Sequence, residues 1–190
     1  MVNVFYTDIT NYQYNERDLI GLYPCRKEYV NSITDIVRKC QSLLVWRLLN
    51  YALSQKIGTS ELSYSLADGK WFDKSGKVKF SLSHSNNIVA VAISTDYNVG
   101  VDVEMCSSKI LKIKSKFNIE DCTESQLIDR LTLLWTEKES LFKADSLGKV
   151  NSVKINDEKG NNYFLSFCSE SINFEIKEVK LHDIISSKGE

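Results

Sequence analysis

The stretch Ile88-Val-Ala-Val-Ala-Ile-Ser-Thr-Asp-Tyr-Asn-Val-Gly-Val-Asp-Val-Glu104 lies near the middle of the 190-residue chain. Residues 88–93 form an almost unbroken apolar run, which is typical of a buried strand. Residues 95–98 predict a turn, and residues 99–104 end in a strict alternation of apolar and polar side chains, as a second strand would. The stretch therefore predicts two strands and the connection between two halves of the chain.

The segments on both sides of this stretch predict a similar order of elements: strand, helix, strands. Upstream, the patterns predict a strand at 2–6, one long amphipathic helix or two at 32–55, a short strand at 62–66, turns at 67–70 and 74–77, an extended segment at 78–81 and a polar break at 83–87. Downstream, they predict helical structure around Phe117, a long helix at 127–147 before Gly148, strands at 152–155, 163–168 and 174–179, and a hairpin turn at Gly160-Asn161. We therefore predict an α+β fold of two similar halves, residues 1–95 and 96–190, although no residue-level repeat relates them.

Composition and charge exclude several classes of protein. The chain is 43% hydrophobic and 26% charged, as in soluble globular proteins, and it shows neither a signal peptide nor a segment able to span a bilayer. A net charge of −1 argues against a general nucleic-acid binder. The five cysteines form no Cys-x-x-Cys pair and predict neither a disulfide framework nor a zinc site, and two histidines are too few for a His-rich metal site. We expect a cytoplasmic protein with reduced thiols.

The segment Trp135-Thr-Glu-Lys-Glu-Ser-Leu-Phe-Lys143 has charges in an unusual place for a helix. The apolar stripe that contains Trp135 also carries Lys138, and Glu139 and Lys143 border it, whereas an exposed helix normally turns its charges to the opposite side. Glu139 and Lys143 can equally form a surface pair four residues apart, worth only about 0.2–0.5 kcal/mol. Taken alone, the segment favours this simpler interpretation.

The motif Asp102-Val-Glu104 places two carboxylates two residues apart on a predicted strand, so both lie on one face. Neighbouring carboxylates repel each other unless a cation or a proton intervenes, and Mg²⁺ typically takes one or two carboxylates together with water and phosphate oxygens. The alternative is an edge strand that turns its polar residues to solvent.

The motif Phe80-Ser-Leu-Ser-His-Ser85 places His84 between two hydroxyls just before a buried strand. Donors gathered in this way suit a phosphate oxygen. The alternative is a histidine in a polar turn that bonds only to its neighbours. Gly69-Lys70 is a weaker signal, because a lysine in a turn is usually solvated.

Taken together, these motifs resemble those of a known family. Gly69-Lys70, residues 80–85, Gly100–Glu104 and residues 135–143 have the order and spacing found in the 4'-phosphopantetheinyl transferases of the surfactin-synthetase-activating type. The resemblance covers nearly the whole chain and is most specific at the last two motifs. One departure is Trp71, which stands where the family usually has a proline after Gly-Lys.

The resemblance implies a pseudo-dimeric monomer in which each half is an antiparallel sheet packed with a long helix, with the active site in the cleft between the halves. It also implies transfer of the phosphopantetheine arm of coenzyme A to a serine of an acyl or peptidyl carrier protein, with Mg²⁺ as cofactor and 3',5'-ADP as product. Carried over by position, the roles are Mg²⁺ binding by Asp102, Glu104 and Glu139, catalysis by Glu139 and Lys143, and binding of the coenzyme A phosphates by Arg26, Ser42, Lys70, Ser83 and His84.

Two other classes of function stay open at this point. A different Mg²⁺-dependent enzyme could cleave phosphoesters with the same carboxylates and without a carrier protein. A non-catalytic binding module would carry the same charges as surface decoration. The modest net charge and the absence of a spanning segment lead us to expect no nucleic-acid partner and no membrane partner. The family type implies a monomer.

Overall fold

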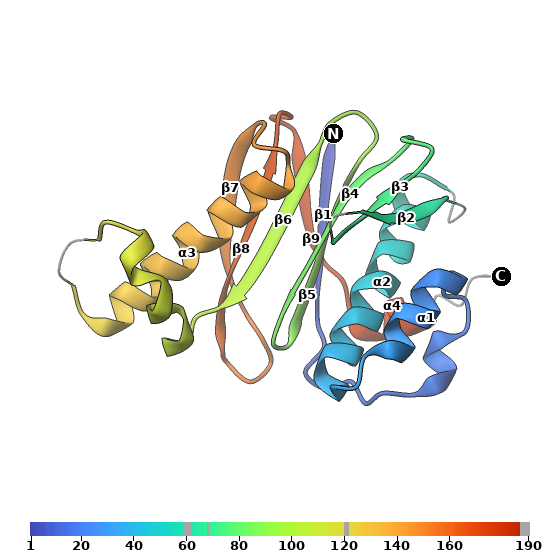
Figure 1. The fold of residues 1–190 in the computed structure, drawn as a ribbon, viewed down its shortest axis with the longest axis horizontal. Helices are drawn as coiled ribbons and strands as arrows, with labels where there is room; N and C mark the ends of the chain where they lie inside the picture. Colours follow the sequence, from blue (N-terminus) through green and yellow to red (C-terminus); the bar gives the residue numbers. More distant parts are fainter. Residues whose placement is uncertain (59–61, 68, 120–121, 187–190) are drawn as a thin grey trace.

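The computed structural model describes residues 1–58, 62–67, 69–119 and 122–186, which have an α+β fold (Figure 1). This fold class is the one predicted from the sequence. The strands are β1 (Val2–Asp8), β2 (Tyr64–Ala67), β3 (Lys70–Asp73), β4 (Lys79–Ser85), β5 (Ile88–Ser94), β6 (Val99–Met105), β7 (Lys149–Asn156), β8 (Asn162–Ser169) and β9 (Phe174–Glu178). The helices are α1 (Pro24–Ser32), α2 (Ile36–Lys56), α3 (Glu124–Lys143) and α4 (Leu181–Ser186), with the 3₁₀ helices η1 (Glu16–Leu19) and η2 (Ser108–Lys116). None of the described helices is both long and apolar enough to cross a membrane.

Two sheets occupy the centre of the molecule. The first has the strand order β4-β5-β1-β9 and is mixed, because β1 pairs antiparallel with β5 and parallel with β9. The second has the order β6-β8-β7 and is antiparallel. β2 and β3 form a separate hairpin.

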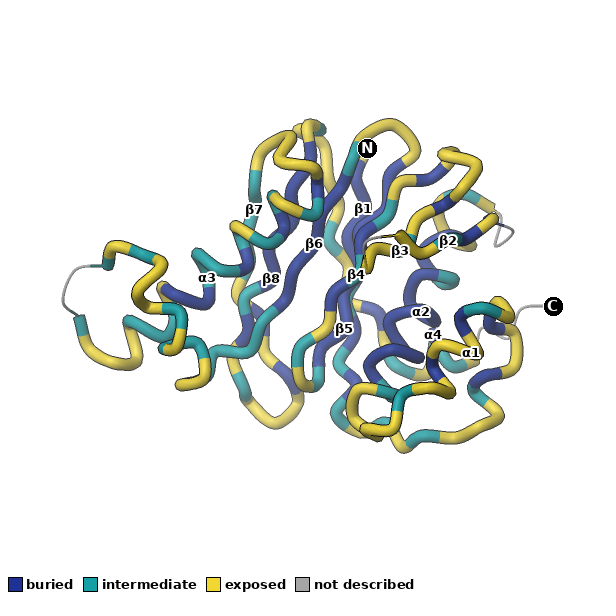
Figure 2. The backbone as a smooth tube through the Cα atoms, in the orientation of Figure 1, coloured by how far each residue is buried: buried dark blue, intermediate teal, exposed yellow. Residues whose placement is uncertain are grey.

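The apolar strand β5 shows how the layers stack. All its residues are buried, and they alternate between two hydrophobic cores. Val89, Val91 and Ile93 pack in the core that contains the leucines of α2, whereas Ile88, Ala90 and Ala92 pack in the core that contains valines of β6. A strand covered on both faces is expected to be apolar throughout. The first sheet thus lies between α2 and the second sheet, and α3 packs on β6 and β8 (Figures 1 and 2).

The predicted polar break at 83–87 is wrong. Ser83, His84 and Ser85 belong to β4, which pairs antiparallel with β5 along its whole length, and the turn is confined to Asn86 and Asn87. Because side chains alternate along a strand, the serines of residues 81–85 lie on one face. Their hydroxyls are hydrogen-bonded to the protein, which is why a polar sequence can form a strand here.

Other element boundaries differ from the predictions for local reasons. α1 was not predicted. Pro24 occupies its first turn, where the missing N–H of proline is not needed. α3 begins earlier than predicted because Thr123 and Gln126 form a capping box, and it ends at Lys143. The helical structure expected around Phe117 is η2, which ends just before that residue.

The C-terminal segment returns to the first sheet. β9 pairs with β1, and α4 packs against α2, which lies beside it in Figure 1. The side chain of Ile184 is buried in the same core as those of α2. The strand that ends the first sheet therefore comes from residues 96–190 and runs parallel to β1, so the expectation of an antiparallel sheet within each half is wrong for this sheet.

Candidate functional site

The candidate site lies where β4 and β6, the edge strands of the two sheets, run side by side (Figure 1). Hydroxyl groups of β4 accept hydrogen bonds from backbone N–H groups of β6: Ser81 Oγ from Val101 at 3.1 Å, Ser83 Oγ from Val103 at 3.2 Å, and Ser85 Oγ from Met105 at 3.2 Å. The constant offset shows that the two strands are parallel. Serine hydroxyls thus accept hydrogen bonds from the backbone N–H groups of β6 that point away from β8.

Lys143 connects α3 to this pair of strands. Its ammonium donates to Asp102 Oδ1 at 2.7 Å and to the carbonyl oxygen of Val101 at 3.0 Å. α3 can lie this close to β6 because Gly100 has no side chain, since a Cβ atom there would be 1.9 Å from the carbonyl oxygen of Ser140. A glycine of β6 therefore allows a lysine of α3 to reach a carboxylate of β6.

Each of the two carboxylates of β6 accepts a hydrogen bond from a serine of β4. Ser83 Oγ donates to Asp102 Oδ1 at 2.9 Å, and Ser85 Oγ donates to Glu104 Oε2 at 2.6 Å. Burial raises the pKa of Asp102, and the charge of Lys143 opposes that rise. Burial also raises the pKa of Glu104, and the hydrogen bond from Ser85 opposes it. The negative charge at both positions therefore depends on neighbouring donors and cations.

Arg26 lines a cavity of about 320 Å³ beside Asp102. The residue is 3% exposed, and Nη2 donates to the side-chain and carbonyl oxygens of Ser42, each at 2.6 Å. Its guanidinium lies over the rings of Tyr29, Trp46 and Trp71. Burial lowers the pKa of Arg26 to about 10, so the group stays charged at neutral pH. Among the described residues it has no ion-pair partner, and its buried Nε has no hydrogen-bond acceptor, which suits an anionic ligand.

His84 lines the same cavity from β4, together with Ser42, Ser83 and Lys143. His84 as a residue is exposed to solvent. The protein atoms around its imidazole nevertheless desolvate the ring and lower its pKa. The positive charges of Lys143 and Arg26 lower the pKa of His84 further. The cavity is therefore electropositive, and an anion bound in it would favour the protonated imidazole.

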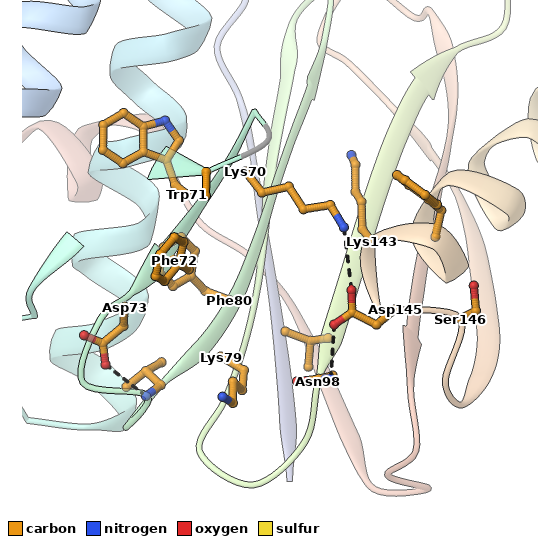
Figure 3. Close-up of a pocket in the computed structure, with 14 residues that line it drawn as sticks. Lys70, Trp71, Phe72, Asp73, Lys79, Phe80, Asn98, Lys143, Asp145 and Ser146 are labelled. Atoms are coloured by element: carbon orange, nitrogen blue, oxygen red, sulfur yellow. Dashed lines mark hydrogen bonds and ion pairs between the residues drawn. The ribbon is translucent and has the colours of Figure 1, made fainter. Parts of the chain in front are cut away.

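Lys70 lies at an adjoining cavity of about 750 Å³, which shares Trp71 and Lys143 with the first. Figure 3 shows the side chain of Lys70 reaching from β3 toward Asp145, which follows α3. Its Nζ is 3.7 Å from Asp145 Oδ1 and 4.6 Å from the centre of the Phe142 ring. The structure thus places Lys70 near Lys143, with a carboxylate as its present partner.

Two of the three predicted metal ligands lie close together. The charge of Asp102 contributes to the raised pKa of Glu104, as expected for neighbouring carboxylates on one strand face. Glu139 is half-buried in α3, and its side chain makes no hydrogen bond or ion pair with the described residues. Within those residues, no group of three His, Cys, Asp or Glu side chains is close enough to hold a metal ion, so Glu139 does not join the pair. The metal role of Asp102, Glu104 and Glu139 stays a prediction.

The pair of carboxylates by itself fits Mg²⁺, which needs only one or two carboxylates when phosphate and water oxygens complete its shell. Asp102 Oδ2 supports this fit, because it is buried and has no hydrogen-bond partner among the described residues. A buried carboxylate oxygen without a donor is destabilising unless a ligand or water satisfies it.

Two residues of this site have partners that were not predicted from the sequence. Ser85 was expected only as one of two hydroxyls suited to a phosphate oxygen, and the structure bonds it to Glu104. The signal for Ser85 was the alternation of serines over 81–85, which indicates a strand. Asp145 gave no signal, because its contacts with Lys70 and Asn98 join segments far apart in the sequence.

The sequence matches no protein-family model, and it matches no curated protein.

Proposed function

We propose that this protein is a 4'-phosphopantetheinyl transferase, which moves the phosphopantetheine arm of coenzyme A to a serine of an acyl or peptidyl carrier protein. The observation that carries the proposal is the ion pair between Lys143 and Asp102, beside a cavity lined by Arg26 and His84. Coenzyme A carries a diphosphate and a 3'-phosphate, so it needs several cationic groups and a cation held by carboxylates. The order and spacing of the motifs support the same activity.

The proposal includes a cleft between two halves, residues 1–95 and 96–190, in which coenzyme A binds. The 750 Å³ cavity supports it, because Lys70 and Phe80 line one side and Asn98 and Lys143 line the other. Its volume lies in the range of about 300–1,000 Å³ that is typical of ligand pockets. A coenzyme A molecule bound across the two cavities would bring its diphosphate to the carboxylates of β6.

In this proposal, the cavity lined by Arg26 and His84 binds the nucleotide end of coenzyme A. Arg26 and His84 bind the 3'-phosphate side, with Ser42 as a further donor. Lys70 exchanges its contact with Asp145 for the diphosphate. Charge-assisted hydrogen bonds of this kind are about twice as strong as neutral ones, so they fix the position of the substrate.

The reaction joins the carrier serine to the phosphorus that bears the pantetheine arm. The serine Oγ–P bond forms while the P–O bond to 3',5'-ADP breaks, and the serine proton passes to Glu139, a transfer typically worth about 10²–10⁴ in rate. Lys143 stabilises the negative charge on the departing 3',5'-ADP. Asp102 and Glu104 would hold Mg²⁺, which when bound would neutralise the charge of the diphosphate. Glu139, the predicted third ligand, does not lie with them in this structure.

The test is the intact mass of an apo carrier protein after incubation with this protein, coenzyme A and Mg²⁺. We expect the mass to rise by one phosphopantetheine group, and we expect no rise with EDTA or with the Asp102→Asn variant. Release of 3',5'-ADP without modification of any carrier would instead indicate a phosphoesterase. A protein that neither modifies carriers nor binds coenzyme A would be a binding module for some other ligand.

A further inference from the structure

Two serines of β4 make the same pair of hydrogen bonds. Ser83 Oγ accepts from the backbone N–H of Val103 and donates to Asp102, the residue before it. Ser85 Oγ accepts from the N–H of Met105 and donates to Glu104, again the residue before. Because a hydroxyl has one proton, the bond accepted from the backbone helps to direct that proton to the carboxylate. The arrangement is repeated after two residues on each strand.

Ser81 makes only half of this arrangement. Its hydroxyl accepts from the N–H of Val101, but the residue before that is Gly100, which has no side chain to receive the proton. Ser81 and Ser83 are both buried, at 8% exposure each. The three serines therefore share their role in joining β4 to β6, and only Ser83 and Ser85 also bind a carboxylate. Ser81 therefore serves to compare a serine that only joins the strands with serines that also position a carboxylate.

We infer that Ser83 and Ser85 are positioning residues, which orient Asp102 and Glu104 for ligation of a divalent cation. This inference rests on the proposed function. Each hydroxyl holds one carboxylate oxygen and leaves the other oxygen free of that serine, and Asp102 Oδ2 is the buried oxygen that lacks a partner among the described residues. Residues that orient metal ligands typically contribute about 10–100-fold to metal affinity.

Ser85 tests the inference more cleanly than Ser83. Ser83 lines the cavity in which the phosphates are proposed to bind, so its loss could weaken substrate binding directly. Ser85 is not among the residues that line that cavity, and its described side-chain contacts are with β6. A change in cation affinity on substitution of Ser85 would therefore act through Glu104.

The experiment measures binding of Mn²⁺, as a spectroscopic probe for Mg²⁺, to the full-length protein in the presence of coenzyme A and without a carrier protein. We expect Ser85→Ala to weaken Mn²⁺ binding by about 10-fold or more, and Ser81→Ala to leave it within about twofold of the unmodified protein. Both variants lose the hydrogen bond from the β6 backbone, and Ser85→Ala also loses the bond to Glu104, so the melting temperature should fall in both and further in Ser85→Ala.

A second pair of variants guards against a failure of Ser85→Ala to fold. Threonine and valine have nearly the same shape, and only threonine carries a hydroxyl. Ser85→Val should therefore lose Mn²⁺ affinity, whereas Ser85→Thr should keep it. Equal Mn²⁺ affinity in these two variants, or an equal loss in Ser81→Ala, would overturn the positioning role and leave the proposed function standing. Absence of Mn²⁺ binding by the unmodified protein would overturn the proposed function, and the inference with it.

Discussion

Gly100 shows how much a single residue contributes to this site. A Cβ atom at this position would lie 1.9 Å from the carbonyl oxygen of Ser140 and 2.8 Å from the nitrogen of Ala144. Both neighbours are backbone atoms of α3 and the turn that follows it, so they can give way only if the helix moves. The contact between Lys143 and Asp102 depends on that helix position.

We therefore predict that Gly100→Ala destabilises the protein by about 1–3 kcal/mol or more, as overpacking in a close contact does. The measurement is the free energy of unfolding in urea. Gly160→Ala is the control, because no atom lies within 4 Å of the place that its Cβ would occupy and only its φ of +79° disfavours alanine, at about 1 kcal/mol. A loss for Gly100→Ala no larger than that of the control would contradict the role given to the close approach.

At the scale of elements, Asp157 joins two hairpins that belong to different sheets. It is 5% exposed and follows β7, and its Oδ2 accepts from Asn87 Nδ2 at 2.8 Å and from the Tyr163 hydroxyl at 2.9 Å. Asn87 lies in the turn between β4 and β5, so this carboxylate ties the two hairpin ends together. Burial raises the pKa of Asp157, but hydrogen bonds from Asn161, Asn87 and Tyr163 outweigh it and lower the pKa to about 2.

This pKa predicts how stability depends on pH. A carboxyl whose pKa is lower in the folded state, about 2, than in the unfolded state, about 3.9, stabilises the fold fully above the unfolded value. Its contribution is lost as the pH falls from about 4 toward 2. We expect Asp157→Asn to be less stable at pH 6 and to lose less further stability between pH 4 and 2 than the unmodified protein, as measured by urea unfolding at each pH. Parallel losses in the two proteins would show that other carboxylates account for the acid sensitivity.

At the scale of the whole molecule, Lys70 and Asp145 connect the N-terminal and C-terminal parts of the chain across the larger cavity (Figure 3). The side chains are 44% and 65% exposed, so the pair is worth at most about 1 kcal/mol of stability. Asp145 lies at φ 56°, a conformation that is uncommon for a residue other than glycine. The pair therefore matters more for the charge of the cavity than for folding.

We predict that Asp145→Asn raises the affinity for 3',5'-ADP by about 2–5-fold at low salt, because Lys70 is no longer shared with a carboxylate and a like charge is removed from the cavity. Lys70→Ala should lower the affinity. Calorimetric titration measures both. The control is Asp96→Asn, whose exposed carboxylate pairs with the N-terminal ammonium. Unchanged or weaker binding in Asp145→Asn would contradict the proposed exchange of partners by Lys70.

The parts of the fold that were predicted correctly have local patterns. β5 and β6 were expected at 88–93 and 99–104, because an apolar run and an alternating run each indicate which faces of a strand are covered. The placement of Asp102 and Glu104 on one strand face followed from the same alternation. The break at 83–87 was wrong because the pattern does not reveal a partner for polar side chains.

The α+β class, the strands on either side of the central turn and the two carboxylates on one strand face could all be read from the amino-acid sequence, because they depend on periodicity within a few residues. The pairing of β9 with β1, the bonds from serines of β4 to β6 and the contact between Asp145 and Lys70 became visible only in the folded chain. Periodicity reports whether a face is covered, whereas the identity of what covers it depends on contacts between segments distant in the chain.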